Sequence, residues 1–413
     1  MITITPVPRA LVPVNSKAAV QISTRNYDEF QGDDEIWNFV QANPTSVLGI
    51  TMPQCDVPSL NDIGKEDLAT SLTRAKLNMA ELIKGDLTRE IKNILWAYEI
   101  EDPRHSKGPQ IGLGGMARTD QIRTEATPRG SIIRNEGIRE GKARGRADII
   151  KATNTIIGTV NNAIDDVSGA IQATLRAHAD STSPDFEVTD SRDVQHRVWI
   201  LDDPTTIAFF IQLFSQEPHA YVADGNHRSA AAVMLGYENF LTVFFPAETM
   251  NIYPYNRLVS EVKDLNPEIL SAVAKKFEVT ELFSTKTYQP TETHQIGIYS
   301  PEKGWMRLCP LPETFDPKNA VDAIDANIVQ RNLFSEIFGI EDPGDPRLTF
   351  VGSNKDVAWL QDAVDEGRAA YAVTLAAVTM EQFIEVCRQN RRMPPKSTWF
   401  EPKIRSGLVM ALL

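Results

Sequence analysis

The chain has 413 residues, of which 42% are hydrophobic and 23% are charged, a balance that can fill a globular core in two or three domains. Its 42 Lys and Arg residues against 55 Asp and Glu residues give a formal net charge of −13. That charge argues against a general nucleic-acid binder, although it leaves room for a local basic patch.

The cysteine positions and the hydropathy exclude further classes of protein. The three cysteines, Cys55, Cys309 and Cys387, are far apart and form no zinc-binding spacing, so we expect three reduced core thiols. The N-terminus lacks the features of a signal peptide, and no apolar run approaches the roughly 18 residues that span a bilayer. We therefore expect a soluble cytoplasmic protein with no membrane partner.

The predicted elements alternate between helices and strands. In chain order, the patterns indicate a helix at 33–41, a strand at 46–51, a helix at 65–84, strands at 93–101 and 111–115, a helical stretch over 149–175, a strand at 196–201, a helix from 204 to about 214, and strands at 220–223 and 239–245. Asp203 is the expected N-cap of the helix that starts at Pro204.

From about residue 262 the pattern changes. Helices are expected at 267–277 and 320–338, strands at 295–300 and 304–308, and a last strand-sized segment at 407–413. This order favours an α+β or mixed α/β fold with a second region.

Residues 118–151 form a basic island. They hold nine basic and five acidic residues, a net charge of +4 within an acidic chain. One interpretation is a solvated helix face. The other is an anion site, because guanidinium groups match phosphate oxygens.

The most informative motif runs from Tyr221 to Ala232, where an apolar strand ends, a glycine turns and a helix begins. A helix N-terminus suits phosphate or carboxylate. Asp224 could hold a metal or take a proton, and His227 and Arg228 could meet a phosphate. The structural alternative is that Asp224 caps the helix and Arg228 pairs with it. The glycines near 112–115 and 137–141 do not complete a classical nucleotide loop.

Two further segments have the composition of site loops: residues 252–259, with Asn256 and Arg257, and residues 393–403, with Lys396 and Trp399. The alternative for both is a surface loop with structural aromatics.

Several motifs in order resemble the domain-of-unknown-function family 1015. They are Asn43-Pro-Thr-Ser-Val-Leu48, His196-Arg-Val-Trp199, Ala223 to Arg228, Asp345-Pro-Arg347, and Met393 to Lys403 followed by Gly407-Leu-Val. The Asp-Gly-x-His-Arg loop is similar to that of free-serine kinases of the ParB/sulfiredoxin-like fold. The resemblance implies a ParB-like catalytic region over 1–261 and an α/β C-terminal region over 262–413, whose segment from about 391 returns to the core.

The resemblance also implies a small-molecule kinase that phosphorylates free L-serine or a similar metabolite, with Mg²⁺ and with ATP, ADP or pyrophosphate as donor. The residues it assigns are catalytic Glu136, Asp224, His227 and Asp28, with Asp224 as metal ligand; donor-binding Gly225, Asn226, Arg228, Ser229, Arg139, Lys142 and Arg146; and substrate-binding Tyr27, Asn256, Arg257, Lys396 and Trp399.

Three positions depart from the family pattern, because Asn135, Asn226 and Asn256 stand where the family has His. Asn keeps hydrogen bonding but cannot relay a proton near neutral pH. A non-catalytic regulator that binds a nucleotide or phosphometabolite is therefore the alternative, and a ParB-like DNA-binding protein is a third hypothesis that the acidic charge disfavours. The sequence leaves a homodimer open.

Overall fold

The computed structural model describes the chain except for residues 106, 263–264, 284–285 and 402. It divides into two compact units: unit 1 comprises 1–134, 138–250 and 402–413, and unit 2 comprises 135–137 and 251–401. The sequence placed a boundary at 261/262, whereas these units divide at 250/251. The assignment of a catalytic region to one of them remains a prediction.

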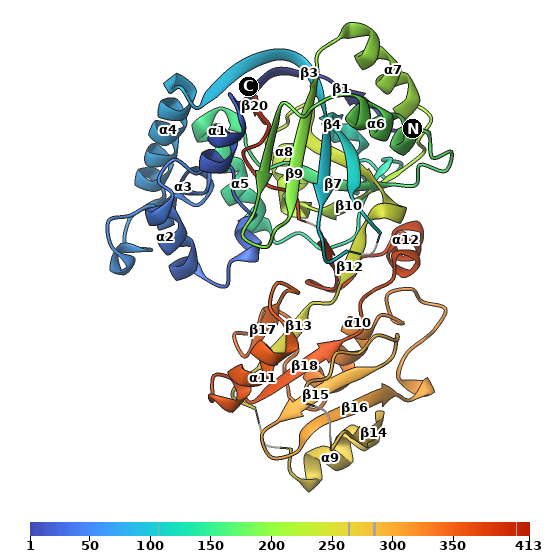
Figure 1. The fold of residues 1–413 in the computed structure, drawn as a ribbon. Coiled ribbons are helices and arrows are strands. Elements are labelled where there is room, and N and C mark those ends of the chain that lie inside the picture. Colours follow the sequence, from blue (N-terminus) through green and yellow to red (C-terminus); the bar gives the residue numbers. More distant parts are fainter. Residues whose placement is uncertain (106, 263–264, 284–285, 402) are drawn as a thin grey trace. The chain divides into compact units, whose positions relative to one another are not determined.

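Unit 1 is built on a twelve-stranded mixed sheet (Figure 1). Its strands are β1 (Ile4–Thr5), β2 (Val7–Pro13), β3 (Thr88–Glu101), β4 (Gln110–Arg118), β5 (Ile132–Arg134), β6 (Thr155–Ile156), β7 (Val160–Ile164), β8 (Phe186–Thr189), β9 (Gln195–Leu201), β10 (Ala220–Asp224), β11 (Asn239–Pro246) and β20 (Met410–Leu412). The main order is β5-β10-β7-β11-β4-β3-β2-β20-β6, with β1 on β4 and with β9 between β3 and β8. The pairs β10–β5 and β11–β7 are parallel, and the other pairs are antiparallel.

The helices of unit 1 are α1 (Ser16–Ile22), α2 (Asp33–Ala42), α3 (Leu48–Thr51), α4 (Leu68–Lys84), α5 (Glu140–Thr153), α6 (Ala170–Ser181), α7 (Pro204–Phe214) and α8 (Asn226–Met234). Figure 1 shows α1 to α4, in blue, gathered together, with α6 and α7 in green at another part of the sheet. Asp203 caps α7 as predicted, since its carboxylate accepts from the Thr206 amide.

Unit 2 is a separate α/β body. Its six-stranded sheet has the order β14-β16-β15-β18-β13-β17 and is antiparallel throughout. These strands are β13 (Asn256–Val259), β14 (Phe277–Glu281), β15 (Ile296–Ser300), β16 (Gly304–Pro310), β17 (Leu348–Val351) and β18 (Tyr371–Leu375), while β12 (Asn251–Tyr253) pairs with β19 (Trp399–Glu401). Its helices are α9 (Pro267–Ala274), α10 (Asp325–Val329), α11 (Val357–Asp365) and α12 (Met380–Arg388), with a π-helical segment at Gln330–Ser335.

The predicted mixed α/β fold class is confirmed, but three local predictions were wrong. Residues 46–51 end in helix α3 rather than forming a strand. The expected helical stretch 149–175 contains β6 and β7, because Asn154 takes a left-handed conformation (φ 51°) that stops α5. The expected helix 320–338 is split into α10 and the π-helical segment.

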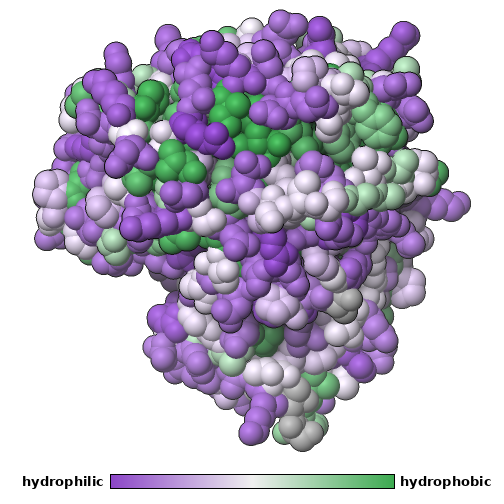
Figure 2. All heavy atoms as spheres, turned by 45° about the horizontal axis from the view of Figure 1, so that its top comes forward, coloured by the Kyte–Doolittle hydropathy of each residue, from purple (hydrophilic) through white to green (hydrophobic). Residues whose placement is uncertain are grey.

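The apolar residues form buried clusters in each unit. The largest apolar cluster of unit 1 lies around Trp199, Phe210, Phe214 and Phe244, and a cluster of unit 2 lies around Trp305. All three cysteines are free, but Cys309 is only half-buried. The face seen in Figure 2 is mostly hydrophilic, with scattered apolar areas. Among the described residues, no helix combines the length and apolarity that a membrane crossing needs.

Candidate functional site

The turn between β10 and α8 brings several predicted residues together. β10 ends at Asp224 and α8 begins at Asn226, so only Gly225 separates strand from helix. Gly225 has φ 101°, a left-handed conformation that glycine adopts without strain, and a Cβ there would lie 2.9 Å from Nε of Arg228. Gly225 is also the N-cap residue, with no side-chain cap. Arg228 pairs with Asp224, as the structural alternative expects, while a capping role for Asp224 stays a prediction.

The Asp224 carboxylate lies between two cations. Arg228 Nη2 donates to Asp224 Oδ2 at 3.0 Å, and Lys403 Nζ lies 3.7 Å from the same oxygen. The Lys403 side chain is only 4% exposed. These three side chains alone carry a net charge of +1, and Lys403 also interacts with the buried carboxyl of Glu29. The sequence analysis did not assign Lys403 to the site.

Asn26 joins this charged group to the C-terminal segment. Arg228 Nη1 lies 3.5 Å from Asn26 Oδ1 and also donates to the carbonyl of Thr159. Asn26 Nδ2 donates to the carbonyl of Ile404 at 3.1 Å, and the Ser406 hydroxyl donates back to Asn26 Oδ1 at 3.1 Å. Asn26 is thus one of three groups, with Asp224 and the Thr159 carbonyl, that contact the Arg228 guanidinium. The sequence analysis missed it, although it directly precedes the Tyr27-Asp28 pair.

Glu29 is a second residue that the sequence analysis missed. It is 2% exposed, accepts a hydrogen bond from the Asn26 amide at 2.9 Å, and lies 3.5 Å from Arg192 Nη2. Burial and the neighbouring Asp28 raise the pKa of Glu29 to about 7, against the opposing effect of Arg192, Lys403 and the Asn26 amide. Asp28, one of the predicted catalytic residues, is half-buried beside it. Glu29, which bonds to Asn26, is thus a buried carboxyl whose pKa is raised towards neutral pH.

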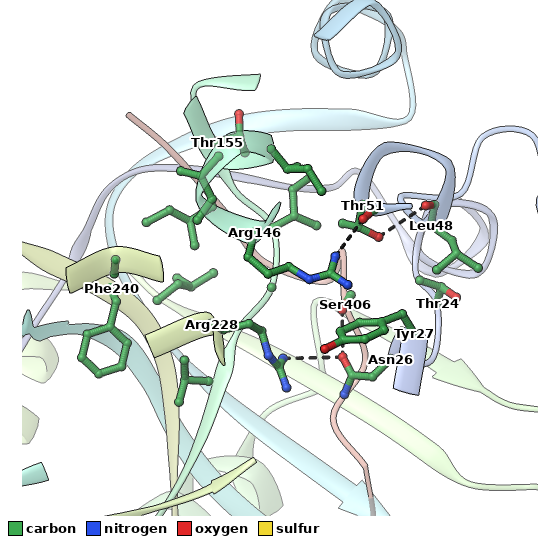
Figure 3. Close-up of a pocket in the computed structure, with 18 of the residues that line it drawn as sticks. Thr24, Asn26, Tyr27, Leu48, Thr51, Arg146, Thr155, Arg228, Phe240 and Ser406 are labelled. Carbon is green, nitrogen blue, oxygen red and sulfur yellow. Dashed lines mark hydrogen bonds between the residues drawn. The ribbon is translucent and has the colours of Figure 1, made fainter. Parts of the chain in front are cut away.

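Arg146 and Tyr27 face each other at a pocket of unit 1 (Figure 3). The Arg146 guanidinium lies 3.8 Å above the Tyr27 ring and donates to the Thr51 carbonyl at 2.7 Å. Burial lowers the pKa of Arg146, and the nearby Arg228 acts in the same direction. Two predicted donor-binding arginines therefore share one pocket with a predicted substrate residue.

The other residues of the basic island and of α8 have different surroundings. The Arg139 amide donates to His227 Nε2 at 3.1 Å, which leaves Nδ1 to carry the proton of a neutral imidazole. The Lys142 side chain is exposed on α5. Ser229 is fully buried, and its hydroxyl donates to the Asn226 carbonyl within α8 at 2.9 Å.

The remaining predicted residues belong to unit 2. Glu136 is half-buried and forms an isolated bridge with Met393. The Asn256 side chain forms hydrogen bonds within unit 2: its Nδ2 donates to Gln289 at 2.9 Å, and its Oδ1 accepts from the Leu375 amide at 3.1 Å. This bonding gives Asn256 a structural role that needs no substrate.

Arg257, Lys396 and Trp399 lie near Tyr255 in unit 2. Arg257 is 2% exposed and donates to the carbonyls of Tyr255 and Lys396; burial lowers its pKa to about 9. Lys396 Nζ donates to the Tyr255 hydroxyl at 3.0 Å, and the Trp399 ring packs edge-on against Tyr255 at 5.1 Å. These residues form a local group within unit 2, and their part in substrate binding stays a prediction.

The chain belongs to the family described as "Protein of unknown function (DUF1015)", whose profile matches residues 4–333. The resemblance inferred from the sequence motifs is thereby confirmed. No protein with a curated description matches the chain in sequence.

Solved structures with a distant likeness include a free serine kinase in complex with AMP, at 13% identity and a TM-score of 0.38, covering 71% of this chain and 92% of that one. A conserved hypothetical protein from Pyrococcus furiosus has 12% identity and a TM-score of 0.38, covering 71% and 95%. SbnI with C-terminal truncation from Staphylococcus aureus has 10% identity and a TM-score of 0.40, covering 72% and 87%.

Proposed function

We propose that this protein is a phosphotransferase that moves a phosphoryl group from ATP, ADP or pyrophosphate to the hydroxyl of free L-serine or a similar small metabolite. The observation that carries the proposal is the group of Asp224, Arg228 and Lys403 at the start of α8, which has a net positive charge and is partly desolvated. Phosphoryl transfer depends on positioning and charge neutralisation more than on covalent chemistry. The choice of serine rests on the family resemblance.

In this proposal the start of α8 holds the donor phosphates. The backbone amides at Gly225, Asn226 and His227 are the first donors of the helix and face an anion favourably. Arg228 and Arg146 neutralise the transferring group, and Asp224 and the Thr159 carbonyl hold Arg228. Asp28 of unit 1 is our candidate for the base that accepts the substrate hydroxyl proton, while the catalytic role of Glu136, which belongs to unit 2, stays a prediction.

Mg²⁺ fits this site only together with a phosphate. Asp224 is one carboxylate shared by two cations at 3.0 and 3.7 Å, which disfavours a divalent ion held by the protein alone. We propose that Mg²⁺ arrives with the donor, with Asp224 as its candidate ligand. Mg²⁺ would then neutralise donor charge, and the positioning of the reactants falls to the protein's own side chains.

The test is phosphorus NMR on the purified chain with Mg²⁺, L-serine and a panel of hydroxy compounds, and each of the three donors in turn. A new phosphomonoester signal is expected with one donor. Asp224→Asn should abolish it, whereas Asp202→Asn, a change at an exposed position one residue before the α7 cap, should leave it unchanged. Absence of product with every donor, in protein whose circular dichroism shows it folded, would refute the proposal.

A non-catalytic regulator is the second candidate. It is favoured by the three Asn residues at His positions of the family, because Asn cannot relay a proton, and the Asn256 amide already bonds to Gln289 and Leu375. Calorimetry that shows tight ATP or ADP binding without any turnover would support it against the kinase.

A further inference from the structure

The pocket beside Arg228 has apolar walls. Its lining includes Ile149 and Ile150 of α5, Ile156 of β6, Val160 of β7 and Leu241 of β11. Ile149 and Ile150 are only half-buried, so apolar side chains face the hollow without a protein partner covering them completely.

Two guanidinium groups enter this apolar hollow from different elements, as Figure 3 shows. Arg228 comes from α8 and is paired with Asp224. Arg146 comes from α5 and donates to the Thr51 carbonyl at 2.7 Å and to Met52 Sδ at 3.3 Å. Within the described part of the chain, no carboxylate forms an ion pair with Arg146.

Asp28 attracts the Arg146 guanidinium without forming an ion pair with it, so hydration lost on burial is not replaced by a carboxylate in direct contact. An anionic ligand would supply that counter-charge. The stacking of Arg146 on Tyr27 at 3.8 Å and its bond to Thr51 hold the guanidinium in one direction before any ligand arrives. Fixed cations of this kind bind an anion with little loss of side-chain freedom.

We propose that this pocket binds an organic anion with an apolar body. Its carboxylate or phosphate head lies at Arg146 and Arg228, and its aliphatic body lies against Ile149, Ile150 and Val160. Free serine, with a single hydroxymethyl side chain, would leave these apolar walls unfilled. The binding of such an anion does not rest on the proposed function, in which the same two arginines meet the transferring phosphoryl group.

The experiment is calorimetry with methyl, butyl and hexyl phosphate and with hexanoate, without nucleotide or Mg²⁺, so that the result does not depend on turnover. Each methylene that enters the apolar part should tighten binding by roughly fourfold, and butyl phosphate should bind on the order of 50-fold more tightly than methyl phosphate. Comparison of hexyl phosphate with hexanoate identifies the preferred head group. Equal affinity along the series would overturn the proposal, as would AMP that displaces hexyl phosphate and binds more tightly.

Two pairs of variants test the two halves of the pocket. Ile150→Ser should weaken hexyl phosphate much more than methyl phosphate, whereas Ile83→Ser, at a half-exposed position of α4 outside the pocket, should change neither. Arg146→Gln should weaken every ligand by tenfold or more, and Arg144→Gln, on the same helix and paired with Glu140, should not. Arg146→Lys keeps the charge without the planar fork and should bind with intermediate affinity. Unchanged affinity in folded Arg146→Gln protein would contradict the placement of the anionic head group at Arg146.

Discussion

Replacement of Glu29 by Gln should change how the stability of unit 1 depends on pH. The side chain is 2% exposed, and the pKa of its carboxyl is raised from 4.5 to about 7 by burial and by Asp28. Gln has the same shape and can still accept the bond from the Asn26 amide, but it does not titrate. The comparison of Glu29 with Gln therefore isolates the effect of the ionisation.

The sign follows from proton binding. Between pH 4.5 and 7 the folded state keeps the Glu29 proton that the unfolded state has lost, so the free energy of unfolding falls as pH rises through this window and is level above it. With about 1.4 kcal/mol per pKa unit, the loss from pH 5 to pH 8 is about 2 to 3 kcal/mol. His196 acts in the opposite direction, because burial holds its pKa well below 6.5 and unfolding then takes up a proton in acid.

The assay is native-state hydrogen exchange in urea, followed on peptides of β3 and β9, for wild type and Glu29→Gln at pH 5, 6.5 and 8 after correction for intrinsic exchange. The effect of His196 is common to both proteins and cancels in their difference. That difference should move by about 2 to 3 kcal/mol in favour of the variant between pH 5 and pH 8. A difference that stays constant with pH would refute the raised pKa of Glu29 and, with it, the account of this buried group.

Three further substitutions test the packing. Gly114→Ala should cost about 3 kcal/mol or abolish soluble expression, because a Cβ there would lie 1.9 Å from the Trp96 ring; thermal unfolding checks it, and a wild-type melting temperature would contradict it. Gly145→Ala should instead stabilise α5 by about 0.5 to 1 kcal/mol, since nothing lies within 4 Å of the added methyl, and a drop in the urea midpoint would count against this. Thr379→Ala should destabilise unit 2 by about 1 kcal/mol, because it removes the capping box in which Thr379 and Gln382 exchange hydrogen bonds; faster exchange confined to α12 is the expected signature.

Predictions from the sequence succeeded where a local pattern has one dominant solution. The Asp203-Pro204 pair fixed the start of α7, because a capping carboxylate and a proline at the first turn are both favourable only there. Predictions from the sequence failed where an apolar run showed neither the period of a helix nor that of a strand. Residues 46–51 are short and apolar, and their burial in unit 1 against α4 selected a helix instead of a strand.

In the candidate site, too, the sequence predicted what a local pattern determines. A strand, a glycine and a helix start can be recognised between Tyr221 and Ala232, because the left-handed turn at Gly225 needs glycine and each element has its own period. The motif also places Asp224 and Arg228 four residues apart in the chain, and a spacing of four allows their side chains to form an ion pair.

By itself, then, the sequence determined the mixed α/β class, the family and the turn from strand to helix at Gly225, since these depend on residues close together in the chain. Only the tertiary structure decided what surrounds the turn. It brought Lys403 to Asp224 and Asn26 to Arg228, and it buried Glu29 beside Arg192. Charges and hydrogen bonds act over a few ångströms in space, whereas these partners come from distant parts of the chain, and no local pattern records which of them will meet.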